Sequence, residues 1–393
     1  MPSNGIRDRV AIVGMGCTRF GEHWDRGANE LLVEAALEAC RSANIERETI
    51  DAYWMGTLTS GRSGLLLSEP LKTGYRPITR VENFCATGSE AIRNAAYAVA
   101  CGAYDLVMAI GVEKLKDSGY SGLASAGGTP TDGTQSSMTA PATFSLLAPA
   151  YSKKYGLDPD TLRRVLTRIA YKNHANGARN PKAQYQREVP EATIENAPKV
   201  AGMLGVFDCS GVSDGASAAI LCRSEDAHKY TDNPLLIKAL SFIAGPADGA
   251  KRQDYDYTTF PEVVASAADA YAQAGVRDAR DEISLAEVHD CFTPTELVLM
   301  EDLGFSARGT AWRDTLDGRF EIGGAQPVNP DGGLKSFGHP IGASGLRMMY
   351  EMWLQFRGEA GPRQVEAPKL GLTHNLGGAP GRCVSFVSVV GAN

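Results

Sequence analysis

A cysteine at position 85 has the surroundings of a catalytic nucleophile. The residue pattern predicts a strand over 80–84 and a helix from about 89 to 101, so Cys85 falls in the turn between them. Thr87 and Glu90 have the spacing of a capping box, which predicts that the helix begins close to the cysteine. Because free N–H groups and the dipole at a helix start stabilise a thiolate, Cys85 is a candidate nucleophile. The alternative is a structural cysteine buried at the end of a strand.

A histidine, an aspartate and a second cysteine follow another predicted strand. Residues 283–288 favour a strand and residues 295–303 favour a helix, with His289, Asp290 and Cys291 between them. Functional sites in α/β sheets form where strands end and helices begin, so this segment is a second candidate site. We expect no zinc there, because His289 and Cys291 would need two more ligands. The alternative is a polar turn with an incidental cysteine.

Two glycine-rich segments complete the set of candidate sites. Residues 333–345 contain His339 and Pro340 before an amphipathic helix, so a backbone or ligand can come close to the imidazole. The glycine spacing matches neither a P-loop nor a dinucleotide fingerprint, which argues against nucleotide binding. Residues 373–381 predict a turn between two closing strands. This turn either is a plain hairpin loop or donates backbone N–H groups to an oxyanion.

Alternating strand and helix patterns must position these segments. Such alternation predicts an α/β fold with a parallel sheet that is covered on both faces. The alternation is interrupted by a region with its own helices and then starts again, which predicts two similar halves and an insertion. The predicted boundaries are 1–116 with 207–232 for the first half, 117–206 for the insertion and 233–393 for the second half.

The composition excludes several classes of protein. The chain has 393 residues, of which 43% are hydrophobic and 22% charged, as in ordinary globular proteins. A net charge of −7 with scattered Lys and Arg argues against a nucleic-acid partner. The eight cysteines include no CxxC pair, which is typical of a reducing compartment. The sequence has neither a long apolar stretch nor a signal-peptide pattern. We therefore expect a cytoplasmic protein that does not bind membranes.

Taken together, the motifs resemble those of the thiolase superfamily, in particular the sterol-carrier-protein-2-type thiolases and related acetyl-CoA acetyltransferases. The resemblance covers the whole chain and implies duplicated βαβαβαββ halves in a five-layered α-β-α-β-α core with an inserted loop domain. Because the chain ends at Asn393, we expect it to lack the fused sterol-carrier domain of some relatives. The segments that carry it are Cys85–Ser89, Gly211–Ala216, His289–Phe292, Gly338–Pro340 and His374–Gly377.

The resemblance also implies roles for individual residues. Cys85 matches the nucleophile that accepts the acyl group, and His339 matches the histidine that activates this thiol and helps to bind the thioester oxygen. Ordinary thiolases have an acid–base cysteine where this chain has Asn375. In the sterol-carrier type the His-Asp-Cys-Phe segment supplies that thiol, so Cys291 is the candidate. We expect the following helix start to lower the pKa of Cys291.

Two oxyanion pockets are implied as well. His289 takes the place of the asparagine that ordinary thiolases use beside one pocket. The backbone N–H groups of Cys85 and Gly377 are expected to form the other.

The implied reaction is a Claisen condensation or the thiolytic cleavage of a 3-ketoacyl-CoA through an acyl-Cys85 intermediate. No metal or redox cofactor is expected, and coenzyme A takes part as a portion of the substrate. Partners implied by the family are a second copy of the chain, as a homodimer or a dimer of dimers, and an OB-fold protein. Alternatives are a retro-aldolase and a non-catalytic acyl-CoA-binding subunit. A basic set in the insertion either meets the CoA phosphates or forms a solvated helix face: Arg163, Arg164, Arg168, Lys172 and Lys182.

Overall fold

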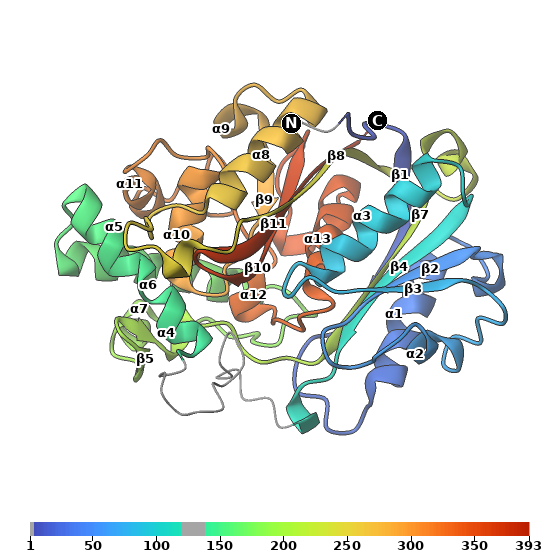
Figure 1. Cartoon of the computed structure of the whole chain (residues 1–393), viewed down its shortest axis with the longest axis horizontal. Helices are drawn as coiled ribbons and strands as arrows, with labels where there is room; N and C mark the ends of the chain where they lie inside the picture. Colours follow the sequence, from blue (N-terminus) through green and yellow to red (C-terminus); the bar gives the residue numbers. More distant parts are fainter. Residues whose placement is uncertain (1–3, 119–137, 393) are drawn as a thin grey trace.

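The computed structural model describes residues 4–118 and 138–392 and contains one large mixed sheet with helices on both faces (Figure 1). The order of its nine strands is β3-β2-β4-β7-β1-β8-β11-β10-β9. Strands pair in parallel in β3-β2-β4 and in β9-β10, and the other neighbours are antiparallel. The sheet is therefore mixed, whereas the sequence predicted a parallel one.

The first half of the fold ends with β7, after the insertion. Its elements are β1 (Val10–Cys17), α1 (Ala28–Ser42), β2 (Ala52–Gly56), α2 (Leu65–Ser68), β3 (Ile78–Val81), α3 (Thr87–Ala100), β4 (Leu106–Glu113) and β7 (Gly215–Arg223). The insertion contributes α4 (Ala140–Phe144), α5 (Leu147–Tyr155), α6 (Pro159–Ala178), α7 (Glu191–Glu195), β5 (Lys199–Ala201) and β6 (Leu204–Gly205). Residues 119–137 of the predicted insertion lie outside the described residues.

The second half repeats the order of the first. Its elements are β8 (Leu235–Ala244), α8 (Pro261–Ala274), α9 (Ala279–Glu282), β9 (Leu285–Glu287), α10 (Thr293–Asp302), α11 (Ala311–Leu316), α12 (Gly333–Ser336), α13 (Ser344–Arg357), β10 (Gly371–Ala379) and β11 (Arg382–Gly391). The spatial order β9-β10-β11-β8 matches β2-β4-β7-β1 of the first half. Val328 forms a parallel bridge with Ala286 of β9, in the place that β3 takes beside β2. Helices α3 and α13 are thus equivalent, and each begins just after one of the predicted site segments.

The helices form layers on the two parts of the sheet. α1 covers one face of the first part and α3 the other, while α8 and α13 do the same for the second part. α3 and α13 pack against each other in the middle of the molecule (Figure 1). The layers α1, first half-sheet, α3 with α13, second half-sheet and α8 confirm the predicted five-layered fold. Pairing of Ala11 and Ile12 with Leu236 and Leu235 joins the two half-sheets.

Sequence patterns explain why these elements form. The apolar residues of α1 recur at helical spacing, and its buried face consists of Leu31, Leu32, Ala35, Ala36, Ala39 and Cys40. β1, β4 and β7 are buried along almost their whole length because helices cover both faces, so they are nearly continuous apolar runs. α13, from Ser344 to Arg357, is the amphipathic helix expected after His339 and Pro340.

Three local predictions were wrong. β3 ends at Val81 instead of residue 84, so the turn before α3 is longer than expected. α3 has no capping box, because the Thr87 hydroxyl accepts from the Asn83 N–H at 2.9 Å instead of from the helix. The glycine-rich segment from residue 373 continues as β10 up to Ala379, because it pairs with β11 residue by residue.

Glycines let the two halves approach closely at the helix starts. A Cβ on Gly345, near the start of α13, would lie 2.5 Å from the backbone nitrogen of Ser89 in α3. A Cβ on Gly111 would lie 2.0 Å from the carbonyl oxygen of Gly342, in the loop before α13. The buried carboxylate of Glu113 accepts from the Gly342 N–H at 3.0 Å and so ties this loop to the first half. The segments before α3 and α13 are therefore brought together.

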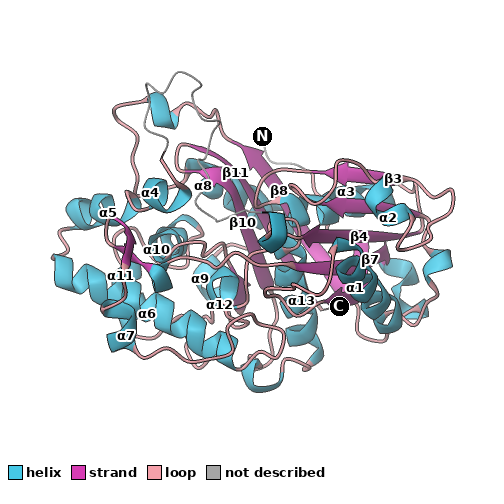
Figure 2. Cartoon of the chain, turned by 90° about the horizontal axis from the view of Figure 1, so that it is seen from below, coloured by secondary structure: helices cyan, strands magenta, loops and turns pink. Residues whose placement is uncertain are grey.

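The insertion packs on the second half and reaches the same region. α6 contacts α10, α11 and α12, as Figure 2 shows from below. Within the described residues, no helix is long and apolar enough to cross a membrane.

Candidate active site

Cys85 lies in a tight turn between β3 and α3. Phe84, just before it, has a φ of 49°, in the left-handed region that residues other than glycine rarely adopt. The Ala86 N–H donates to the Asn83 carbonyl at 3.1 Å and closes the turn. The Cys85 thiol is free and half-buried. The strained turn therefore holds Cys85 just before the first turn of α3.

His289 and Cys291 follow β9, where the chain turns toward α10. His289 is 1% exposed and Cys291 is 6% exposed. The Ser210 N–H donates to the Cys291 carbonyl at 2.8 Å, which joins this turn to the segment before β7. The Cys291 sulfur lies 3.8 Å from the Thr295 hydroxyl.

His339 lies in the loop between α12 and α13. Gly338 has a φ of 120°, and a Cβ there would lie 2.5 Å from the Ser213 hydroxyl oxygen. That oxygen accepts from the His339 backbone N–H at 3.0 Å. The loop can therefore present the imidazole only with a glycine before it.

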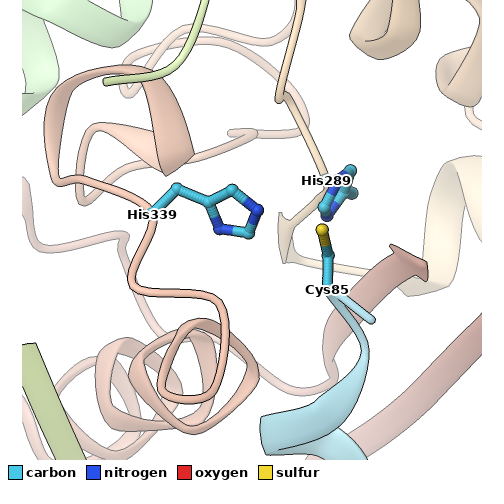
Figure 3. A group of neighbouring side chains, drawn as sticks. All are labelled: Cys85, His289 and His339. Atoms are coloured by element: carbon cyan, nitrogen blue, oxygen red, sulfur yellow. The ribbon is translucent and has the colours of Figure 1, made fainter. Parts of the chain in front are cut away.

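The three segments meet at one point. The Cys85 sulfur and one nitrogen each of His289 and His339 all lie within 4.8 Å of one another (Figure 3). The two imidazole rings are nearly perpendicular, with centroids 5.4 Å apart. These three residues and Cys291 line one cavity of about 350 Å³. The structure therefore brings Cys85, Cys291, His289 and His339 to one cavity, with Cys291 outside the compact group of three.

Hydrogen bonds determine which nitrogen of His339 carries the proton. With the Ser344 hydroxyl donating to the Pro340 carbonyl at 2.9 Å, its oxygen accepts from His339 Nδ1 at 2.7 Å. Nδ1 is therefore protonated and Nε2 has a free lone pair. Nε2 is buried and has no hydrogen-bond partner among the described residues. Since Nδ1 is engaged by Ser344, Nε2 is the nitrogen available to the Cys85 thiol.

His289 has the opposite tautomer. The Asn375 amide nitrogen, which can only donate, lies 3.5 Å from His289 Nδ1. The Asn375 amide oxygen accepts from the Ser89 hydroxyl at 2.6 Å, which orients the amide. His289 therefore carries its proton on Nε2, where it can act as a donor. Asn375, at the position where the resemblance predicted the acid–base cysteine of ordinary thiolases, thus contacts a histidine.

Burial controls the ionisation of all four groups. Burial, together with the nearby Glu113 and Glu82, raises the pKa of Cys85 to about 12. Burial and the neighbouring Cys85 raise the pKa of Cys291 well above its usual range. Burial lowers the pKa of His339 to about 3, and burial and His339 lower that of His289.

The expected stabilisation of thiolates by helix starts is therefore wrong for both cysteines. Each cysteine lies one residue before the N-cap of its helix, and desolvation outweighs the dipole there. In the free protein both thiols keep their protons, while both imidazoles are uncharged.

Gly377 packs against the turn that carries Cys85. It lies in β10 opposite Val384, and a Cβ on it would lie 2.5 Å from the Asn83 carbonyl oxygen. Its neighbour Gly378 lines the cavity. An oxyanion pocket formed by the N–H groups of Cys85 and Gly377 stays a prediction.

The basic residues of the insertion mostly form ion pairs within the protein. Arg163 pairs with Asp208, Arg168 with Glu191, Lys172 with Glu296 and Lys182 with Glu38, while Arg164 donates to the Thr161 hydroxyl. These four pairs argue against a free cluster for CoA phosphates. A second cavity of about 710 Å³ shares Val200, Cys209, Ser210 and Gly211 with the first. The exposed Arg187, which forms no ion pair with the described residues, lines this second cavity.

Sequence reasoning missed the residues that orient the two histidines. Ser344 and Ser89 each lie beside a glycine in the first turn of a central helix. This paired Ser and Gly pattern at the starts of α3 and α13 was the available signal, because it allows close helix contact and supplies a hydroxyl.

Family models cover most of the chain. The thiolase N-terminal domain matches residues 10–225, and the thiolase C-terminal domain-like model matches residues 248–388. The fold and the site define a thiolase-type α/β protein with a cysteine and two histidines in one cavity. The chain belongs to the thiolase family, as the resemblance of its motifs predicted.

Curated relatives align along the whole chain. It is 38% identical to an acetyl-CoA acetyltransferase of Methanothermobacter thermautotrophicus, over 96% of this chain and 98% of that protein. It is 34% identical to the acetyl-CoA acetyltransferase of Methanocaldococcus jannaschii, over 98% of this chain and 99% of that protein. It is 32% identical to human sterol carrier protein 2, over 94% of this chain and 70% of that protein.

Solved structures show the same fold. An Ltp2-ChsH2(DUF35) aldolase matches with a TM-score of 0.82 and 26% identity, over 98% of both chains. Human mitochondrial 3-ketoacyl-CoA thiolase in complex with CoA matches with a TM-score of 0.69 and 18% identity, over 99% of both chains.

Proposed function

We propose that the protein is an acyl-CoA C-acyltransferase, which performs Claisen condensation or thiolytic cleavage of a 3-ketoacyl-CoA through acyl-Cys85. One observation carries this proposal: the Cys85 thiol lies beside His339, whose Nε2 has a free lone pair and no partner among the residues that the structure describes. The family and the acetyl-CoA acetyltransferase relatives support the same activity.

The first half-reaction transfers an acyl group to Cys85. Because the thiol keeps its proton at neutral pH, His339 Nε2 must take that proton as the sulfur attacks the thioester carbonyl. The carbon–sulfur bond to CoA then breaks, and the CoA thiolate needs a proton. Cys291 lines the same cavity and carries a proton of its own, so it is the donor.

The second half-reaction uses the Cys291 thiolate that the first one leaves. This thiolate removes an α-proton from a second acyl-CoA, and the enolate carbon attacks acyl-Cys85. Cys85 leaves as a thiolate and recovers its proton from the His339 imidazolium. All proton carriers then return to their starting states. The raised pKa of Cys291 suits this cycle because it makes the thiolate a strong base.

The enolate oxygen must meet hydrogen-bond donors in the cavity. His339 becomes a donor at Nε2 once it has taken the Cys85 proton, and His289 offers its Nε2–H directly or through a water. One such donor is typically worth about 3–4 kcal/mol of transition-state stabilisation. We place the CoA nucleotide near the second cavity, where Arg187 is available to a phosphate.

The proposal is tested with purified protein and acetyl-CoA. We expect an acetyl group on the peptide that contains Cys85, measured by mass spectrometry after digestion, and none in Cys85→Ala. An unmodified Cys85 peptide combined with tight CoA binding would favour the non-catalytic acyl-CoA-binding subunit.

Cys291→Ala separates the two half-reactions. We expect this variant to keep acetylation of Cys85 but to lose condensation by about 100-fold or more, because acid–base groups typically contribute about 10²–10⁴-fold. Cys209→Ser is the control, since Cys209 lines the same cavity without a role in this cycle. Condensation at the normal rate in Cys291→Ala would assign the base to another group.

A second candidate activity is retro-aldol cleavage, because the aldolase structure matches with a TM-score of 0.82. The presence of both Cys85 and Cys291 favours the acyltransferase. Release of an aldehyde or ketone from a β-hydroxyacyl-CoA that survives Cys85→Ala would favour the aldolase.

The proposal includes a cytoplasmic homodimer. β3 is the edge strand of the sheet, and Phe84 beside the nucleophile is 56% exposed, which suits a second subunit there. Two further assemblies belong to the proposal, namely a dimer of dimers and a complex with an OB-fold partner protein. The DUF35 component in the aldolase structure is compatible with such a partner.

A further inference from the structure

Cys85, His289 and His339 combine donor types that zinc prefers. Their sulfur and nitrogen donors lie within 4.8 Å of one another. Zn²⁺ binds cysteine sulfur and imidazole nitrogen, and its reactive sites keep three protein ligands and one open position. We propose that this cluster is a Zn²⁺ site, and that a metal ion there and an acyl group on Cys85 exclude each other.

The spacing of the donors is close to that of a metal site. Zinc–nitrogen bonds of about 2.0–2.1 Å and zinc–sulfur bonds of about 2.3 Å place tetrahedral donors about 3.3–3.6 Å apart. The three donors therefore need to approach by only about 1 Å. Rotation of the Cys85 side chain and small tilts of the two rings supply this movement, because the cavity leaves space on that side.

The protonation of the histidines suits metal binding. His339 Nε2 has no partner among the described residues and so has a lone pair for a metal, whereas the lone pair of His289 lies on Nδ1, beside the Asn375 amide. The Nδ1–H of His339 already donates to the Ser344 hydroxyl, which is how ligand histidines are usually oriented. His289 has a neighbouring amide in Asn375 at 3.5 Å, a contact weak enough for the ring to adjust.

The chemistry of binding explains why the two states exclude each other. Zn²⁺ bonds to the Cys85 sulfur and displaces its proton, so one proton is released for each metal bound. The sulfur lone pair that would attack a thioester is then held by the metal. The fourth position faces the cavity, where a water or an added thiol completes the tetrahedron. The sequence argued against zinc at His289 and Cys291, because that pair lacks two further ligands. In the folded protein the donors beside His289 are instead Cys85 and His339, which come from other segments.

Cobalt is the spectroscopic probe for this site, because Co²⁺ adopts the same geometry and absorbs visible light. We expect the full chain, without acyl-CoA, to bind one Co²⁺ with a thiolate charge-transfer band and tetrahedral visible bands, and Zn²⁺ to displace it. Cys85→Ser should lose the charge-transfer band. His339→Asn should bind at least about 10-fold more weakly, since losing even a partner of a ligand costs about 10–100-fold.

Cys209→Ser and Cys291→Ser are matched controls, because both residues line the same cavity but lie outside the cluster. Both should keep the charge-transfer band, and circular dichroism checks that every variant folds. Absence of the band in the unmodified protein, or its survival in Cys85→Ser, would overturn the proposal.

A second measurement separates this inference from the proposed function. Zn²⁺ should protect Cys85 from iodoacetamide, a chelator should restore the reaction, and protection should strengthen as pH rises because a proton is released. Normal acetylation of Cys85 without cobalt binding would contradict the metal-site proposal and leave the acyltransferase proposal intact. Cobalt binding without any acetylation would defeat the acyltransferase alone.

Discussion

At the scale of single residues, the site depends on where two protons lie. Ser344 holds the His339 proton at Nδ1, and Asn375 holds the His289 proton at Nε2. One ring can therefore accept a proton from Cys85 while the other can donate to an oxyanion. Because burial keeps the Cys85 thiol protonated, the proposed reaction needs His339 as a base and does not start from a thiolate formed in advance.

Ser344→Ala tests this arrangement. Without the hydroxyl, His339 can carry its proton on either nitrogen, so acetylation of Cys85 by acetyl-CoA should slow by about 10-fold or more. Single-turnover acetylation followed by mass spectrometry measures this rate. Ser344→Thr keeps the hydroxyl and should stay close to the normal rate. An unchanged rate in Ser344→Ala would remove Ser344 from the orientation of His339.

At the scale of elements, two equivalent helices bring the candidate site segments together. α3 follows Cys85 and α13 follows His339, and their first turns meet at Gly345 and Ser89. The same Ser89 hydroxyl bonds Asn375, so helix packing and the orientation of His289 are connected.

Gly345→Ala should disturb both the packing of α3 against α13 and the orientation of His289. The new Cβ would lie 2.5 Å from the Ser89 backbone nitrogen, which cannot move aside without shifting α3. We expect a loss of about 1–3 kcal/mol in the free energy of unfolding, as for other overpacked sites, and slower acetylation of Cys85. Urea denaturation and the acetylation assay measure these effects.

Gly323→Ala is the matched control, because a Cβ at Gly323 meets nothing within 4 Å. Equal stability of the Gly345→Ala and Gly323→Ala proteins would contradict the close helix contact.

At the scale of the whole molecule, the buried histidines make stability depend on pH. Burial lowers the pKa of His174, His339 and His374 to about 3. The unfolded chain takes up protons near pH 6.5, but the folded chain does not, so stability falls as pH drops from about 6.5 toward 3. Each such histidine contributes up to about 1.4 kcal/mol per pH unit in this range.

His374→Leu tests one of these contributions. His374 is fully buried in β10, and neither of its ring nitrogens has a partner among the described residues. The difference in unfolding free energy between the variant and the unmodified protein should shift in favour of the variant as the pH falls from 8 to 4–5. The midpoint of urea unfolding at each pH measures the change. The exposed His228→Gln is the control, and an identical pH profile for His374→Leu would contradict the assignment.

The sequence could predict most of the element order and the segments that form the site. Residue patterns identified α3, α10 and the amphipathic helix α13, and cysteine, histidine and glycine motifs at element ends identified Cys85, His289, Cys291 and His339. Strand ends were less certain. β3 ends earlier and β10 continues further than predicted, because pairing with neighbouring strands decides where a strand stops.

The amino-acid sequence alone determined the repeated order of strands and helices and the chemical types present in the site, since both follow from local residue patterns. Only the tertiary structure decided the ionisation and tautomers of these groups. Desolvation acts on a thiol according to everything packed around it, and a histidine proton is positioned by a partner from another turn. For the same reason, folding placed Cys85 and His339 beside His289, a juxtaposition of segments that lie up to 254 positions apart in the chain.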